Sequence, residues 1–262
     1  MSVTINNFLG AKPNPNIKII EKKGGFGVIE YQRDIGLVSP SMSVAAFYAS
    51  QMNIRKRQLA IELSAGPVTL QAGAMQWMAG NVKMTSGIKG VGDAVGKLFK
   101  GAVTGESAAK PEYTGTGLLV TEPTYKHLIL SEAQDWGSGI VLEDGMFLAC
   151  ESGMKQTIVK RENMSSAVAG GEGLFNLCLS GHGVFCVESR CPRDDLIEIV
   201  LEQDEVRIDG NYAVAWSKDL AFTVEKASKS FAGSAVSGEG FVNVYRGTGR
   251  IWMEPLAKMP DL

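Results

Sequence analysis

Short apolar or alternating runs, bounded by glycine, proline, aspartate and serine, recur along the chain and predict strands. The run 196–201 is typical of them, and a turn within 24–34 precedes a predicted strand over 28–32. One run near the N-terminus differs. Residues 44–49 are small and apolar and suit a short helix capped by Ser41 or Ser43, although a run this short can equally be a strand.

A Gly-x-Gly motif, interpreted as a turn, starts at residues 115, 181 and 247, a constant step of 66 residues. Other markers keep this step. The glutamates after the motifs are Glu122, Glu188 and Glu254, and the Gly-Glu pairs before them start at 105, 171 and 238, the last after 67 residues. Independent markers with one period predict tandem repeats.

A predicted strand also recurs before each motif, at 68–70, 140–142 and 206–208, and each leads into a glycine and an aromatic-containing run: Gly73 with 75–78, Gly145 with 146–149, Gly210 with 212–216. The step from 70 to 142 is 72 residues, so the first unit carries six extra residues in or beside 87–101. The predicted organisation is a leader, 1–56, that covers an edge of the β body, then modules 57–123, 124–189 and 190–262, the last with a short C-terminal tail.

Three such modules bury their mutual faces best when packed side by side, so we expect one cooperative all-β body. Strand edges left at the ends of the row invite pairing between subunits unless something covers them.

The sequence resembles the altered-inheritance-of-mitochondria family, number twenty-four, over roughly residues 57–256. The resemblance rests on the segments 73–78 and 81–84, the glycine-rich Lys-Leu-Phe segment running to 105–107, the segment 170–175 and the Gly-x-Gly motifs. The absence of a basic presequence indicates a bacterial-type member.

The resemblance implies three tandem β-sandwich or double-stranded β-helix modules, similar to the tryptophan RNA-binding attenuation protein. Proteins of that shape associate edge to edge into rings, so the resemblance implies a homo-oligomer, expected to be a trimer with a pseudo-ninefold ring. It supplies no catalytic residues.

Composition adds few constraints. The formal net charge of −2 gives no global attraction to nucleic acid or anionic lipid, which makes nucleic acid an unlikely partner. The N-terminus lacks the features of a secretory signal and no run approaches the length of a membrane span, so we expect a cytoplasmic protein. Four clustered cysteines are too few for a secreted disulfide framework and are interpreted as reduced thiols.

By spacing, Cys178, His182, Cys186 and Cys191 look like a zinc site, and a hairpin at 181–183 would let Cys178 and Cys186 face each other. The repeat argues against this. Cys186 occupies the position of Val120 and Trp252 in the other units, which favours buried thiols and a turn histidine. We therefore expect no metal site and no cofactor.

The segment 87–101 mixes glycine and lysine but matches neither a phosphate-binding loop nor a dinucleotide motif. Its apolar residues fall at helical spacing and predict an amphipathic helix or lid in the first module, with peripheral membrane contact or a partner surface as the alternative.

The densest basic run, Arg55-Lys56-Arg57, is interpreted as a solvated strand start, with RNA binding as the alternative. Two histidines and no Gly-x-Ser-x-Gly elbow leave little room for hydrolytic chemistry, and the repeated glutamates favour strand-end or inter-module hydrogen bonds. We expect no enzyme and no catalytic residue. The leading hypothesis is a non-enzymatic oligomeric scaffold or assembly protein with an unknown protein partner; the alternative is a nucleic-acid or small-ligand binding ring.

Overall fold

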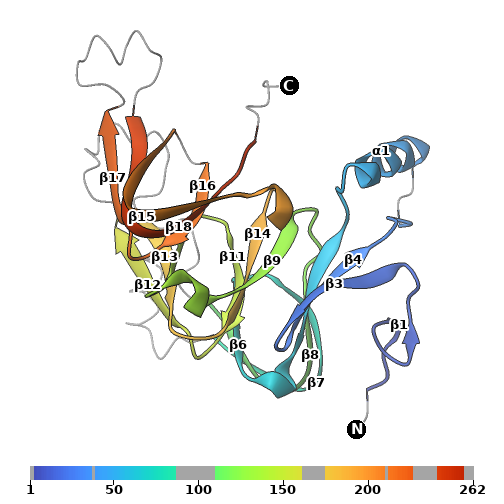
Figure 1. Cartoon of the computed structure of the whole chain (residues 1–262). Coiled ribbons are helices and arrows are strands. Elements are labelled where there is room, and N and C mark those ends of the chain that lie inside the picture. The colour runs from blue at the N-terminus through green and yellow to red at the C-terminus, as the bar shows by residue number, and fades with distance from the viewer. Residues whose placement is uncertain are drawn as a thin grey trace.

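The computed structural model describes residues 3–36, 39–86, 110–160, 175–209, 212–226 and 241–256, and strands dominate it (Figure 1). This confirms the predicted all-β class. In chain order the elements are β1 (Asn6–Phe8), β2 (Lys12–Pro13), β3 (Ile17–Lys23), β4 (Phe26–Tyr31), α1 (Pro40–Gln51), β5 (Arg57–Glu62), η1 (Leu63–Ala65), β6 (Val68–Leu70), β7 (Met75–Thr85), β8 (Glu112–Thr121), β9 (His127–Glu132), η2 (Ala133–Trp136), β10 (Ile140–Leu142), β11 (Phe147–Glu151), β12 (Lys155–Lys160), β13 (Phe175–Ser180), β14 (Val184–Ser189), η3 (Arg193–Asp195), β15 (Ile197–Asp209), β16 (Ala213–Ser217), β17 (Ala221–Lys226) and β18 (Phe241–Met253).

The strands form two large sheets. The nine-stranded sheet has the order β3-β4-β5-β8-β6-β11-β14-β9, with β7 paired to β8; the seven-stranded sheet has the order β12-β13-β10-β16-β18-β15, with β17 paired to β18. The nine-stranded sheet is nearly closed, because its two end strands meet. Glu21 Oε2 on β3 accepts a hydrogen bond from the backbone N–H of Leu130 on β9 at 3.3 Å, and Lys23 Nζ lies 3.4 Å from Glu132 Oε1.

The largest core cluster joins the two sheets. It contains Phe147 and Phe185 from the nine-stranded sheet and Ile140 and Trp252 from the seven-stranded one. Trp136 from η2 packs edge to face against Trp252, with ring centroids 4.7 Å apart. Because this shared core contains side chains from both sheets, burial of its apolar surface binds them into one body.

The Gly-x-Gly interpretation needs a correction. Only 181–183 lies between two strands, β13 and β14, whereas 115–117 and 247–249 lie inside the long strands β8 and β18. The first glycine has φ near +100° to +120° in all three: 108° at Gly115, 101° at Gly181 and 120° at Gly247. The motif therefore marks a bend in a strand path, which glycine adopts without the penalty of a Cβ.

A β-bulge recurs in three antiparallel strand pairs. The register shifts between Met75 and Trp77 in β7, between Phe147 and Ala149 in β11, and between Ala213 and Ala215 in β16. One residue further along each partner strand, a glutamate N–H donates to a carbonyl: Glu122 to Ala74 O, Glu188 to Met146 O and Glu254 to Tyr212 O, at 2.7 to 2.8 Å. The repeated glutamates thus share a strand-end backbone hydrogen bond.

The N-terminal segment extends the nine-stranded sheet. β4 pairs with β5 and β3 pairs with β4, so Phe26, Val28 and Ile29 are buried between neighbours. Helix α1 lies on the connection from β4 to β5 and projects from the body (Figure 1). The predicted helix is confirmed, but Ser39 is its N-cap, accepting from the Met42 N–H at 3.2 Å; neither Ser41 nor Ser43 has this position. The predicted helix over 87–101 and the Gly-Glu pairs at 105, 171 and 238 lie outside the described residues.

Candidate functional site

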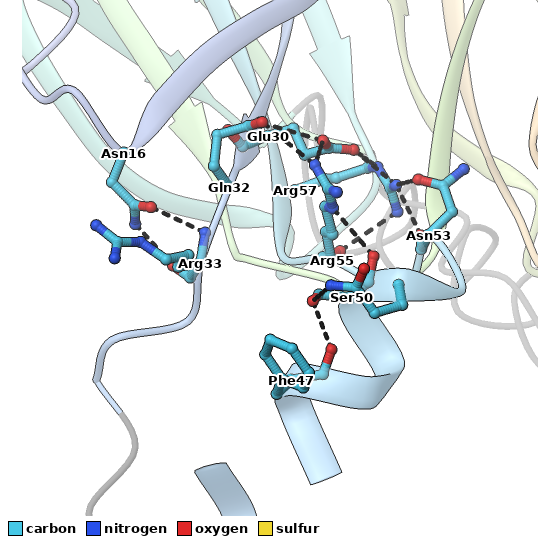
Figure 2. Close-up of polar contacts among 10 residues, drawn as sticks. Asn16, Glu30, Gln32, Arg33, Phe47, Ser50, Asn53, Arg55 and Arg57 are labelled. Atoms are coloured by element: carbon cyan, nitrogen blue, oxygen red, sulfur yellow. Dashed lines mark hydrogen bonds and ion pairs between the residues drawn. The ribbon is translucent and has the colours of Figure 1, made fainter. Parts of the chain in front are cut away.

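A polar network lies at the base of helix α1 and contains Glu30 and Arg57, two charged side chains that are buried in the described structure (Figure 2). It forms because β4 and β5 are antiparallel and place Glu30 directly opposite Arg57. Opposite charges on facing residues of an antiparallel pair attract each other. Both positions are buried within their strands, so this pair is held inside the sheet.

Glu30 is shared by two arginines. Its Oε2 accepts from Arg57 Nε at 3.0 Å and lies 2.7 Å from Arg57 Nη2, and its Oε1 accepts from Arg55 Nη1 at 3.2 Å. The side chains of Arg57 and Glu30 are only 2% and 8% exposed. Charges removed from water to this extent are stable only when they are paired and hydrogen-bonded, and these two are.

The arginines also hold the end of helix α1. Arg57 Nη2 donates to the Asn53 carbonyl at 3.0 Å and to Asn53 Oδ1 at 2.9 Å, while Arg55 Nε donates to the Ser50 carbonyl at 3.4 Å. Carbonyls at the end of a helix lack partners within it, and cations at this end are favoured by the helix dipole. The network therefore fixes the last turn of α1 to the sheet.

The run Arg55-Lys56-Arg57 does lead into a strand, because β5 begins at Arg57, but the prediction that the run is solvated is wrong. Arg57 is buried, and Lys56 Nζ lies 3.3 Å from Asp34 Oδ1 and 4.6 Å from the centre of the Tyr31 ring. All three basic side chains are thus paired with two acids, Glu30 of β4 and Asp34 in the segment after it. The same pairing weakens the RNA-binding alternative for this run, since the cations already have anionic partners.

Neighbouring groups have perturbed pKa values. Burial, reinforced by the positive charge of Arg57, lowers the pKa of His127 to about 4, against the smaller opposing effects of Glu30 and Asp195. A hydrogen bond from the Tyr125 hydroxyl lowers the pKa of Asp34, and the same bond raises the pKa of Tyr125. His127 is therefore neutral at pH 7 beside the ion pair.

The cysteines are all buried free thiols, as predicted. The hairpin that would bring two of them together does not exist, because β13 and β14 diverge into different sheets: Cys178 pairs with Val141 of β10, and Cys186 pairs with Leu130 of β9. His182 is exposed in the bend between them. Burial raises the pKa of Cys150 to about 12 and that of Cys186 well above its usual value. Among the described residues, no three or more histidine, cysteine, aspartate or glutamate side chains are grouped as metal ligands would be.

The repeated glutamates share a backbone position but have different side-chain surroundings. Glu122 is exposed, and Glu188 pairs with Lys126 at 2.9 Å. Glu254 is buried and accepts from Ser189 Oγ at 3.2 Å, from the Arg190 N–H at 3.1 Å and from Arg190 Nε at 2.7 Å. Three different environments do not amount to one chemical site repeated three times.

Glu30 and Asn53 were not identified from the sequence as members of the network. A signal for Glu30 was present, because a lone carboxylate inside the apolar strand Phe26–Tyr31 requires a buried partner. Nothing in the sequence identified that partner, since the strand opposite is reached only after helix α1.

Comparison with known proteins agrees with the resemblance seen in the sequence. The family described as mitochondrial biogenesis AIM24 matches residues 50–256. The chain belongs to this family. An uncharacterized protein of Streptococcus pyogenes serotype M6 is 32% identical over 199 residues, which are 73% of this chain and 77% of that relative. An X-ray structure of a Streptococcus pyogenes protein superposes with a TM-score of 0.56 at 28% identity, covering 78% of this chain and 90% of the other.

The match to the AIM24 family starts at residue 50, so β1 to β4 and nearly all of α1 precede it. Glu30 lies in this preceding segment and Arg57 lies inside the match. The ion pair therefore joins the N-terminal segment to the family domain. No helix in the described part of the chain is long and apolar enough to span a bilayer.

Proposed function

We propose that this AIM24-family protein is a non-enzymatic scaffold whose copies assemble head to tail through the two edges of the seven-stranded sheet. The supporting observation is that β15 and β12 end the strand order of this sheet. Within the described residues, β15 pairs only with β18 and β12 pairs only with β13. Each strand thus offers one row of backbone N–H and C=O groups, the usual template for pairing with another chain.

The two edges have opposite charge. β15 carries five acidic residues and one arginine over Ile197–Asp209, whereas Lys155–Lys160 of β12 begins and ends with lysine and contains no acid. Two of the five acids, Glu198 and Glu205, are paired with arginines, so the acidic character of this edge rests on Glu202, Asp204 and Asp209. Like edges would repel, but an acidic edge attracts a basic one. This complementarity favours a heterologous contact, in which β15 of one copy meets β12 of the next, and such contacts close into rings when the rotation permits.

The geometry of β15 also fits a short partner. A bulge between Leu201 and Asp204, with φ of 55° at Gln203, divides this 13-residue strand into two straighter segments. Each segment is about as long as the six-residue β12. The bulge limits indefinite edge pairing, as bulges do on natural edge strands, while leaving a segment long enough for one partner strand.

A trimer is the assembly we expect, with a mass three times that of the 28.0 kDa chain. The alternative role, a ring that binds nucleic acid or a small ligand, has no comparable support, since the basic run that suggested it is internally paired.

Charge reversal tests the edge contact. Glu202 and Asp204 are exposed on β15, so Glu202→Lys with Asp204→Lys places positive charge opposite the lysines of β12. We expect light scattering to show loss of the wild-type oligomer, and the added change Lys155→Glu to restore part of it. Glu62→Lys with Glu122→Lys, a matched reversal at two exposed acids outside this sheet, should leave the mass unchanged.

A wild-type protein that stays monomeric at micromolar concentration would refute the proposal. So would an oligomer whose mass does not respond to the reversal on β15.

A further inference from the structure

Helix α1 presents its apolar side chains away from the protein body. Val44, Phe47, Tyr48 and Met52 are 57%, 61%, 66% and 76% exposed, and no residue of the helix is buried. The partly buried positions, Ala46, Ala49 and Ser50, are small and lie on the opposite side of the helix. A surface helix normally places its large apolar residues toward the core, so this helix has the reverse orientation.

The exposed face also lacks charge. From residue 39 to residue 53 the chain contains no aspartate, glutamate, lysine or arginine. Large contiguous apolar surfaces are uncommon on proteins that function alone and mark surfaces of interaction. Phenylalanine, tyrosine and methionine, three of the four large residues here, are enriched in protein interfaces.

The helix is held ready for contact. Ser39 caps its first turn, the Glu30, Arg55 and Arg57 network fixes its last turn, and the rings of Phe47 and Tyr48 pack edge to face with centroids 5.5 Å apart. An element fixed before binding loses little conformational entropy when a partner arrives. An apolar helix that is held fixed in water is unfavourable unless a partner covers its exposed face.

We propose that the outward face of α1, formed by Val44, Phe47, Tyr48 and Met52, docks against the same face of a second copy of this chain across a two-fold axis. A two-fold axis places the same surface of both copies face to face, so a charged face would meet its own charge. The face of α1 has no charge and avoids this repulsion. Four side chains of this size, each more than half exposed, offer roughly 500 Å². Two copies of the face would together bury roughly 1,000 Å², which reaches the lower bound for a specific interface.

A lipid surface fits this face less well. Helices that lie on membranes carry lysine and arginine on their polar side, whereas α1 has none. The nearest cations, Arg55, Lys56 and Arg57, are occupied by Glu30 and Asp34. The chemistry of the helix therefore favours a protein surface of its own kind.

This contact is independent of the strand-edge contact. Helix α1 adjoins the nine-stranded sheet, while β12 and β15 belong to the other sheet, on the far side of the molecule (Figure 1). Pairing of helices then turns a monomer into a dimer and, with the two-fold axes perpendicular to the axis of the ring, a trimer into a hexamer.

The first experiment measures mass by light scattering for the wild type and for Val44→Ser with Tyr48→Ser. Because both side chains are exposed, the variant keeps its fold, which circular dichroism verifies. We expect the wild-type mass to be twice that of the variant. Ile20→Ser with Met84→Ser removes two exposed apolar side chains outside α1 and should leave the wild-type mass unchanged.

The second experiment is cross-linking with a short bis-maleimide. All four native cysteines are buried, so Gln51→Cys, seven residues from Val44 on the same side of the helix, adds one accessible thiol. We expect a covalent dimer from Gln51→Cys, and none from the control Lys18→Cys on β3.

A mass ratio of one between wild type and the helix variant would overturn the proposal, as would the absence of a cross-linked dimer. Phosphatidylcholine vesicles that bind the wild type but not the helix variant, with equal masses in solution, would assign the face to lipid and also overturn it. The strand-edge proposal is judged separately, by the mass of the helix variant itself: three chains support it and one chain refutes it.

Discussion

The substitution Glu30→Gln tests whether the buried network stabilises the protein. Glutamine keeps the size of the side chain but removes the charge that faces Arg57 and Arg55. Arg57 is 2% exposed and cannot regain water without opening the sheet. Removing one partner of a buried ion pair costs about 3–5 kcal/mol, because it leaves the other charge uncompensated.

The expected loss lies at the lower end of that range. Arg57 keeps its hydrogen bonds to the Asn53 carbonyl and side chain and to the Arg55 carbonyl, so part of its charge stays solvated by the protein. We therefore expect the free energy of unfolding, measured by urea denaturation, to fall by about 3 kcal/mol.

Glu188→Gln is the matched control. It makes the same chemical change in an ion pair of similar length, 2.9 Å to Lys126, but that lysine is 46% exposed. Surface ion pairs contribute about 0–1 kcal/mol, so the control should be nearly neutral. If the free energies of unfolding of the two variants fall by amounts that differ by less than 1 kcal/mol, then the buried Glu30–Arg57 pair contributes no more stability than a surface ion pair.

The pKa of His127 provides a second measurement on the Glu30→Gln variant. Glu30 raises the pKa of His127 while Arg57 lowers it. Loss of the carboxylate should therefore lower the pKa of His127 further, which NMR titration of the imidazole measures. A rise in that pKa would mean that Arg57 leaves the site in the variant, and that the network reorganises rather than persists.

Two further predictions concern pH and backbone strain. The pKa of His127 is near 4 in the folded state and 6.5 in the unfolded one, so the unfolded state binds the proton first and stability falls as pH drops from about 6.5 to 4. His127→Gln should flatten this part of the stability profile, and an unchanged slope would contradict the shift. Gly115→Ala should destabilise by more than about 3 kcal/mol, because its Cβ would lie 2.1 Å from the Asn81 carbonyl oxygen. Gly181→Ala, at a similar φ in open space, should cost about 1 kcal/mol, and equal losses in urea denaturation would show that the close approach is relaxed elsewhere.

Local patterns in the sequence predicted the strands well, because a strand is selected by residues that are neighbours in the chain. The predicted strands 68–70 and 140–142 are β6 and β10, and 206–208 lies in β15. The burial of Cys186 followed from comparing equivalent positions at one period. The division into three modules stays a prediction, which the recurring bends and bulges support.

The errors came from relations between distant residues. Arg57 looked solvated because its partner Glu30 lies 27 residues earlier and meets it only through β4–β5 pairing. The two cysteines looked like a facing pair because a glycine bend resembles a hairpin in sequence, while the sheets that separate β13 from β14 are set by pairing with β10 and β9. The N-cap of α1 was predicted wrongly for a local reason, because Ser39, Ser41 and Ser43 all lie near Pro40 and each is a suitable N-cap residue.

The ion pair between Glu30 and Arg57 fixes the orientation of helix α1 in the N-terminal segment. Because β4 and the AIM24-family strand β5 hold the two charges in register, the direction of α1 is fixed by the sheet and not by the flanking loop. The two proposed contacts, helix to helix and edge to edge, are then fixed relative to each other. Weakening the network with Glu30→Gln should consequently loosen the pairing of helices while leaving the strand edges intact, which separates the two contacts without changing a residue in either.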